Sequence, residues 1–333
     1  EALDDNTTAN DNTAVGAYAL QKNTTGISNT AVGAYALDAS TTAAYNTAVG
    51  RNCMGDCTTG SDNACVGENA AANLTTGVNN TIMGVGAGRD ITTASHNTAI
   101  GRAALGGSGS AVTGNYNTAV GRNALAVVTS AYNNTTVGYS ALSALTTGYA
   151  NATLGYSAGG SITTGANNIC IGRNAGESGS PSGTINTGND NICLGDNNIN
   201  NLYCADTSIS SSDARDKTDV TDFTKGLDWI KALRPVTYRW DRRTWYGTEE
   251  EPYGTPDGSK KKQRLHIGFL AQEALAVEQA NGYGHDNNDS LILNLTEDGM
   301  SYGMKYERLV PVLVNAIKEL SAEVEQLKSQ LNN

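Results

Sequence analysis

Asn12-Thr13-Ala14-Val15-Gly16-Ala17-Tyr18-Ala19-Leu20 recurs unchanged at residues 29–37. Its first five residues return at Asn46, and variants of them open at Asn63, Asn80, Asn97, Asn117, Asn134, Asn151, Asn168 and Asn191. Eight of the ten intervals are 17 residues, and the other two are 20 and 23. Short β-branched runs punctuated by Gly and Asn at a fixed period are typical of a β-solenoid. We therefore predict a mainly β fold, with a β-solenoid (β-roll) shaft of about eleven coils over residues 1–205.

Each position of the repeat, compared across the coils as a column, predicts a structural role. The fourth position is aliphatic from Val15 to Leu194, so we predict that it faces a core. The fifth position is always Gly, which indicates a positive φ or a close backbone approach. The Asn column is expected to form a stacked ladder that satisfies backbone groups, unless Asn merely favours the turn.

Four of the six cysteines, Cys53, Cys65, Cys170 and Cys193, occupy positions where other coils have Ala. Packing as small apolar side chains is the favoured interpretation. Disulfides between Cys53 and Cys57, or between Cys170 and Cys193, are the less favoured alternative. The two longer intervals place insertions at 106–113 and 177–183, which we interpret as tolerated bulges, with binding loops as the alternative.

Charge and cysteine spacing exclude several classes of function. The net charge is −11; residues 1–205 hold 6 basic and 12 acidic residues and the remainder 16 and 21, so both parts are acidic (−6 and −5). This argues against nucleic acid as a partner. No apolar run is long enough for a membrane-spanning helix. The cysteines match no zinc spacing, and no cofactor is expected. The chain begins at Glu1 without Met, and we expect an attachment module to precede it.

Residues 206–333 differ in composition from the repeat. We predict helices over 228–233 and 271–279, strands over 236–240 and 265–270, and a hairpin from 291–295 and 300–302. Residues 206–307 are expected to form a small α+β domain, followed by a coiled-coil helix over 308–333. The apolar residues of that helix are spaced 3, 4, 3, 4, 3, 4: Val310, Leu313, Ile317, Leu320, Val324, Leu327 and Leu331. Their types lean towards a dimer by the heptad rules.

Two resemblances follow from these motifs. The repeat resembles the heads of trimeric autotransporter adhesins and the β-rolls of phage tail fibres, which implies a homotrimer. We favour this trimer over the dimer, since the coiled coil is short. Four ordered motifs resemble the C-terminal intramolecular chaperone auto-processing domain of phage endosialidases and tail spikes. They are Ser212-Asp213-x-Arg215-x-Lys217, Leu233-x-Pro235-Val236-x-Tyr238-x-Trp240, 268–273 (Gly-Phe-Leu-Ala-Gln-Glu) and Tyr306-Glu307-x-Leu309-Val310-Pro311.

The second resemblance implies a single-turnover endopeptidase that cuts between Ser211 and Ser212. Ser212 would be the nucleophile and Lys217 its base, because a serine hydroxyl is weak until a base takes its proton. His266 is a candidate assistant, with a structural role as the alternative. Five residues is not a same-face helical spacing, so Ser212 and Lys217 need a turn between them or contact across chains. Asp216 and Asp219 depart from the family pattern and are expected to favour a charged Lys217; an uncut seam is the alternative.

The function predicted is therefore a structural fibre of a phage or virus, a host-attachment appendage of the virion. Its C-terminal domain would promote trimerisation and folding, and a glycan or protein receptor on the host surface would be its external partner. A bacterial trimeric surface adhesin or another extracellular fibre is the alternative. A glycan-cleaving enzyme is disfavoured, because the shaft offers few paired carboxylates.

Overall fold

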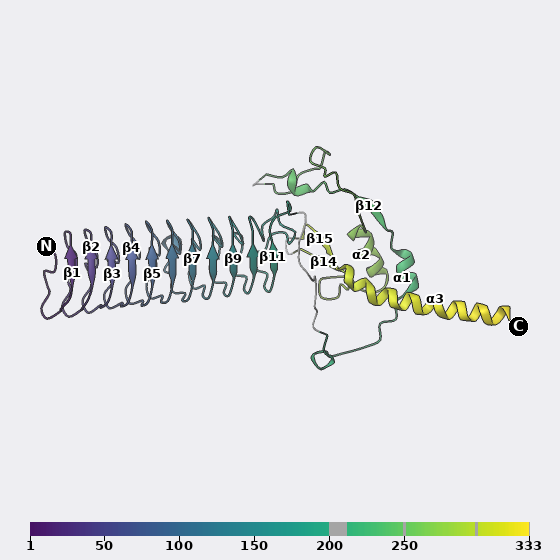
Figure 1. Ribbon diagram of the computed structural model, residues 1–333, viewed down its shortest axis with the longest axis horizontal. Helices are drawn as coiled ribbons and strands as arrows, with labels where there is room; N and C mark the ends of the chain where they lie inside the picture. Colours follow the sequence, from purple (N-terminus) through teal and green to yellow (C-terminus); the bar gives the residue numbers. More distant parts are fainter. Residues whose placement is uncertain (200–211, 249–250, 297–298, 333) are drawn as a thin grey trace. The chain divides into compact units, whose positions relative to one another are not determined.

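The computed structural model describes residues 1–199, 212–248, 251–296 and 299–332. The chain divides into two compact units, residues 1–199 and 200–333. We call the first the shaft and the second the C-terminal unit (Figure 1). The expected boundary between residues 205 and 206 lies outside the described residues.

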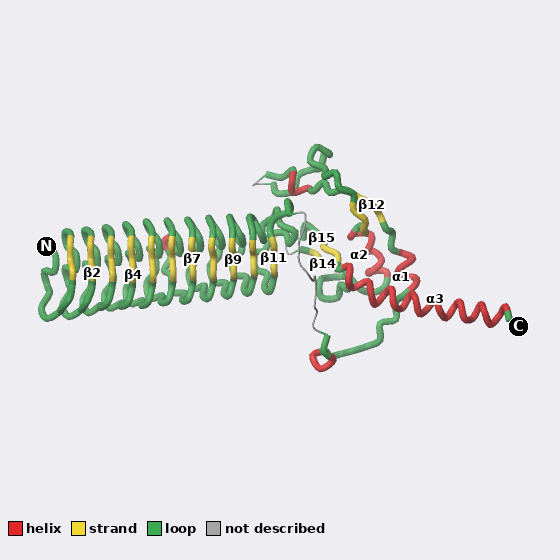
Figure 2. The backbone as a smooth tube through the Cα atoms, viewed as in Figure 1, coloured by secondary structure: helices red, strands yellow, loops and turns green. Residues whose placement is uncertain are grey.

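The shaft is a β-solenoid in which each coil contributes one three-residue strand to a single parallel sheet (Figure 2). The sheet follows chain order from β1 to β11, in register, so that Thr13 pairs with Thr30 and Ala14 with Ala31. The strands are β1 Thr13–Val15, β2 Thr30–Val32, β3 Thr47–Val49, β4 Ala64–Val66, β5 Thr81–Met83, β6 Thr98–Ile100, β7 Thr118–Val120, β8 Thr135–Val137, β9 Ala152–Leu154, β10 Ile169–Ile171 and β11 Ile192–Leu194. The predicted solenoid and its eleven repeats are confirmed.

The middle residue of each strand, not the aliphatic one after it, faces the core. From β2 to β11 this third repeat position is buried, as in Ala31, Cys65 and Ile82. The fourth position, predicted to be internal, faces outward: eight of its eleven residues are 36–56% exposed, including Val15 and Met83. The prediction was wrong because neighbouring strand residues point to opposite faces, and in most coils the smaller of the two side chains lies inside. The shaft therefore carries an aliphatic column along its outside.

The Asn column forms the expected ladder. Asn80 Nδ2 donates to Asn63 Oδ1 at 2.9 Å and to the carbonyl of Ala94 at 3.0 Å. The backbone N–H of Asn97 in turn donates to Asn80 Oδ1 at 3.0 Å. These amides are buried, so each one satisfies backbone groups that water cannot reach.

The Gly column meets both expectations made for it. Gly50 has φ 139°, and a Cβ placed there would lie 2.4 Å from the carbonyl oxygen of Gly67 in the next coil. The five described cysteines, Cys53, Cys57, Cys65, Cys170 and Cys193, are buried free thiols, in agreement with a packing role.

The described residues of the C-terminal unit form three α-helices and two small antiparallel sheets. The helices are α1 Leu227–Ala232, α2 Ala271–Ala280 and α3 Leu309–Leu331; the paired strands are β12 Val236–Tyr238 with β13 His266–Gly268, and β14 Leu293–Leu295 with β15 Tyr302–Met304. Each corresponds to a predicted element. Trp229, Val277, Ile292 and Val312 form the centre of its core. No helix of the described chain is long and apolar enough to cross a membrane.

Candidate catalytic site in the C-terminal unit

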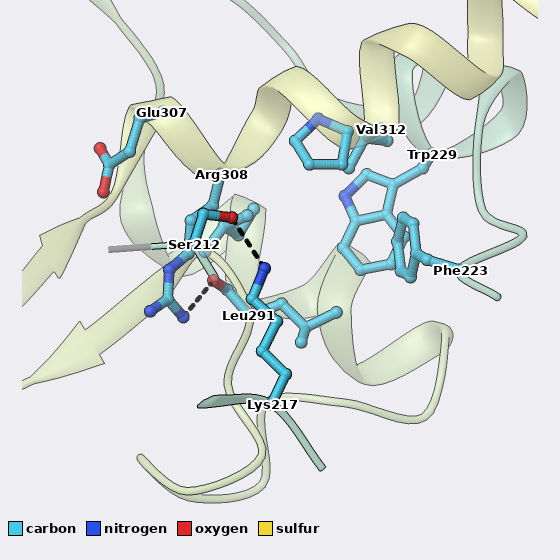
Figure 3. A pocket seen from close by; sticks show the side chains of 10 residues that line it. Ser212, Lys217, Phe223, Trp229, Leu291, Glu307, Arg308 and Val312 are labelled. Carbon is cyan, nitrogen blue, oxygen red and sulfur yellow. Dashed lines mark hydrogen bonds between the residues drawn. The ribbon is translucent and has the colours of Figure 1, made fainter. Parts of the chain in front are cut away.

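Residues 212–217 form a tight turn that brings Ser212 and Lys217 together. The carboxylate of Asp213 accepts a hydrogen bond from the backbone N–H of Arg215 at 2.9 Å and so caps the short 3₁₀ helix η2, Ala214–Asp216. The backbone N–H of Lys217 then donates to Ala214 O at 3.3 Å, which closes the turn. As a result Lys217 Nζ donates to Ser212 Oγ at 2.7 Å (Figure 3). The turn that the five-residue spacing required is present within one chain.

Arg215 stabilises this turn. Its guanidinium forms an ion pair with Asp213, and this hydrogen bond holds the pKa of the Asp213 carboxyl below its usual range. Arg215 is largely exposed and Asp213 is half-buried, so the ion pair between them holds the shape of the turn and adds little stability.

Asp216 and Asp219 do not pair with Lys217. In the described part of the chain, neither carboxylate forms an ion pair with the Lys217 amine, which contacts Ser212 instead. The departure from the family pattern thus leaves the contact between the hydroxyl and the amine intact.

A cavity of about 670 Å³ lies beside the two residues. We call it the Ser212 cavity. Its walls are mostly apolar, with a few charged groups at the rim; the lining residues are Ser212, Lys217, Phe223, Trp229, Leu291, Ile292, Glu307, Arg308, Pro311 and Val312. Figure 3 shows these side chains arranged around the pair. An apolar hollow with a few convergent polar groups is the common form of a substrate site.

Polar side chains of α3 fix the wall that contains Phe223 and Trp229. Glu319 Oε2 accepts the backbone N–H of Leu227 at 2.7 Å, at the first turn of α1. Asn315 Nδ2 donates to the carbonyl of Phe223 at 2.6 Å. A carboxylate at a helix N-terminus is favourable because it meets unpaired N–H groups and the positive end of the helix dipole.

Glu278 fixes the opposite wall. It is fully buried on α2 and accepts hydrogen bonds from the backbone N–H groups of Leu291 and Ile292 and from Ser290 Oγ. Sequence reasoning missed Glu278, Asn315 and Glu319. Asn315 and Glu319 bind residues 92 positions away and Glu278 binds residues 12–14 positions away, so no local motif marks them.

Trp229 was also missed as a cavity residue. It is 2% exposed, and its indole N–H has no hydrogen-bond partner. A buried donor left unpaired costs about 1–3 kcal/mol.

His266 lies elsewhere in the unit. It is on β13, where its ring stacks on Tyr238 with centroids 5.5 Å apart. Among the described residues it contacts neither Ser212 nor Lys217, and it does not line the Ser212 cavity. A structural role fits this position better than assistance to the nucleophile. Ser211, the other residue of the expected cleavage site, lies outside the described residues.

The predicted coiled-coil residues form an apolar face of α3 that no described part of the chain covers. Leu309, Val312 and Ala316 are buried on the neighbouring face of the helix, where Leu309 and Val312 belong to the unit's own core. The heptad residues Val310, Leu313, Ile317, Leu320, Val324, Leu327 and Leu331 are 43–86% exposed.

Comparisons with known proteins agree with the second resemblance. Residues 212–283 match the family model described as chaperone of endosialidase, and the match begins at Ser212. This confirms the predicted type of C-terminal domain. No curated protein and no solved structure matches the chain significantly.

Proposed function

Because residues 212–283 match the chaperone of endosialidase and follow a β-solenoid shaft, we propose that three copies of this chain form a fibre whose C-terminal units drive its folding. The match is the observation that carries the proposal. Long parallel β arrays assemble slowly and expose strand edges, so a domain that brings three chains into register would counter that hazard.

Exposed apolar surface in both units supports assembly. The heptad face of α3 is uncovered over the length of the helix, as a coiled coil between copies requires. The aliphatic column of the shaft runs from Val15 to Leu194, and eight of its eleven residues are exposed. Contiguous apolar patches of this kind mark interaction sites. A second and a third copy fit best, since every chain offers the same lengthwise surfaces.

The test of assembly is the mass of the particle in solution. Before any cleavage, the wild-type particle is expected at three times the 34.6 kDa of one chain. Ile317→Asp buries a charge in the coiled coil and should give smaller particles, whereas Ala322→Asp, on another face of α3, should not. A wild-type monomer, or equal effects of the two substitutions, would contradict the proposal.

We further propose that the C-terminal unit cuts itself off once, before Ser212. Ser212 Oγ would attack the carbonyl carbon of the preceding residue, while Lys217 accepts the hydroxyl proton and passes it to the Ser212 nitrogen as the C–N bond breaks. Water would then hydrolyse the resulting ester, leaving a carboxylate on residue 211 and the free hydroxyl of Ser212. The 2.7 Å contact between the hydroxyl and the amine supports this assignment.

Intact-mass measurement tests the cleavage. Wild type should split between Ser211 and Ser212, and Ser212→Ala and Lys217→Ala should stay whole. Lys231→Ala removes an exposed lysine of α1 and should cut like wild type. An uncut wild type would refute the protease role and would not contradict the chaperone role.

As its place of action we propose the tail fibre of a phage or virus, with a receptor on the host surface. The resemblance of both the shaft and the C-terminal domain to phage fibres supports this attribution. A bacterial surface adhesin or another extracellular fibre shares the shaft resemblance alone.

A further inference from the structure

Among the described residues that line the Ser212 cavity, one buried polar group has no hydrogen-bond partner. Trp229 lies on α1, and less than 1 Å² of its Nε1 atom is accessible to water. In Figure 3 this nitrogen is on the edge of the ring that faces Ser212 and Lys217. An indole N–H can only donate a hydrogen bond, so this group needs an acceptor.

The orientation of this ring is fixed by its neighbours. Phe223 and Tyr283 lie against it, with ring centroids 6.0 and 6.2 Å away. Turning the indole to pair the N–H elsewhere would break these contacts. The orientation of the donor is therefore fixed before any acceptor arrives, which reduces the reorganisation needed to stabilise charge.

The other polar groups of the cavity are less suited to receive a carbonyl oxygen. Lys217 contacts the nucleophile, and Arg308 Nη1 donates to Leu291 O at 3.1 Å. Glu307 is a carboxylate and can only accept when ionised. Among the lining residues that the structure describes, Trp229 is the one with a buried, unpaired donor.

We propose that Trp229 Nε1 is the hydrogen-bond donor for the carbonyl oxygen of the acyl group that Ser212 attacks. This inference rests on the self-cleaving role proposed above. As the Oγ–C bond forms, the carbonyl π electrons move to the oxygen, and the indole N–H stabilises the negative charge. When the tetrahedral intermediate collapses, those electrons return and the C–N bond breaks. Because the nitrogen is shielded from water, the cavity wall shifts slightly when the carbonyl oxygen approaches it.

The sharpest test removes the N–H and keeps the ring. Site-specific replacement of Trp229 by benzothienylalanine substitutes sulfur for the N–H group at nearly constant shape. Trp245 provides a matched control, because its Nε1 is also buried and unpaired but the residue does not line the Ser212 cavity. Particle mass is measured for every variant, so that loss of assembly is not mistaken for loss of chemistry.

Two readouts are compared. The first is the rate of self-cleavage by intact mass. The second is covalent labelling of Ser212 by an alkyl fluorophosphonate, in which an Oγ–P bond forms, fluoride leaves and the hydroxyl proton passes to Lys217. Removal of one donor of this kind lowers rates by roughly 10²–10³-fold. We expect a loss of about that size for both readouts at position 229 and wild-type rates at position 245.

The outcomes separate the two proposals. If wild type cuts or is labelled and the analogue at 229 reacts at the same rate, the donor role is wrong whatever the fate of self-cleavage. If wild type is labelled in a way that depends on position 229 but never cuts, self-cleavage fails and the donor role stands. A wild type that neither cuts nor takes the label refutes both.

Discussion

Replacing one asparagine of the Asn ladder by alanine should destabilise the shaft far more than the small loss of side-chain volume suggests. Asn80→Ala deletes the amide that donates to Ala94 O and accepts from the backbone N–H of Asn97. Both backbone groups are left inside the shaft without a partner. At about 1–3 kcal/mol for each buried unpaired group, the loss of local stability is about 2–6 kcal/mol.

The matched control is Thr81→Ala, one residue further along the same coil. Thr81 is exposed on β5, and Ala64 occupies the same repeat position one coil earlier. Exposed substitutions of this type usually change stability by less than about 0.5 kcal/mol. The two variants therefore alter neighbouring residues of one coil with very different predicted effects.

Native-state hydrogen exchange on the full chain measures the difference, because repeat arrays need not unfold in one step. Amides between residues 80 and 97 should lose roughly 30-fold or more of their protection in Asn80→Ala, since each 1.4 kcal/mol corresponds to tenfold. Thr81→Ala should keep the wild-type pattern. Equal protection in the two variants would refute the ladder as a source of stability.

Three further outcomes are expected. Gly67→Ala should destabilise the shaft by about 1–3 kcal/mol in the same exchange experiment, because φ is 139° there and the new Cβ would lie 2.5 Å from Gly84 O; wild-type protection would refute this. Burial raises the pKa of Glu177 above its ordinary 4.5 despite hydrogen bonds from Ser161, so the stability it contributes is present below pH 4.5 and lost as the pH rises through the raised pKa. Glu177→Gln should not show that loss in unfolding measured across this range, and identical pH profiles would contradict the assignment. Burial also raises the pKa of Cys57 to about 12, so iodoacetamide at pH 8 should label it only after unfolding, and rapid native labelling would argue against its buried position.

The sequence was most informative where one local pattern repeats. Each 17-residue copy specifies a short strand, a glycine bend and a buried asparagine, and stacking the copies reproduces the shaft. In the C-terminal unit, every predicted helix and strand is present, because the spacing of apolar residues and the positions of Gly and Pro report local structure directly.

The candidate site was only partly predictable. Ser212 and Lys217 are close in the chain, so a single turn joins them, and their residue types could be read from the motif. Trp229 and Glu278 could not be found in this way. Their roles follow from tertiary packing. Packing places Trp229 beside the cavity with an unpaired N–H group, and it places Glu278 against the backbone N–H groups of Leu291 and Ile292.

The amino-acid sequence by itself determined the coil length, the number of repeats and the heptad of α3, since these depend on residues at fixed spacing. Only the tertiary structure decided which face of each strand is inside. Alternation allows either face, and packing within the coils places the smaller side chain inside in most of them, so that Ala31 is buried and Val32 lies on the outer face. It also decided that Leu20 and Leu37 adopt a left-handed backbone with φ near 50°, which leucine rarely does. Hydrogen bonds from the N–H groups of these leucines to the next coil hold that conformation, and no single coil could supply them.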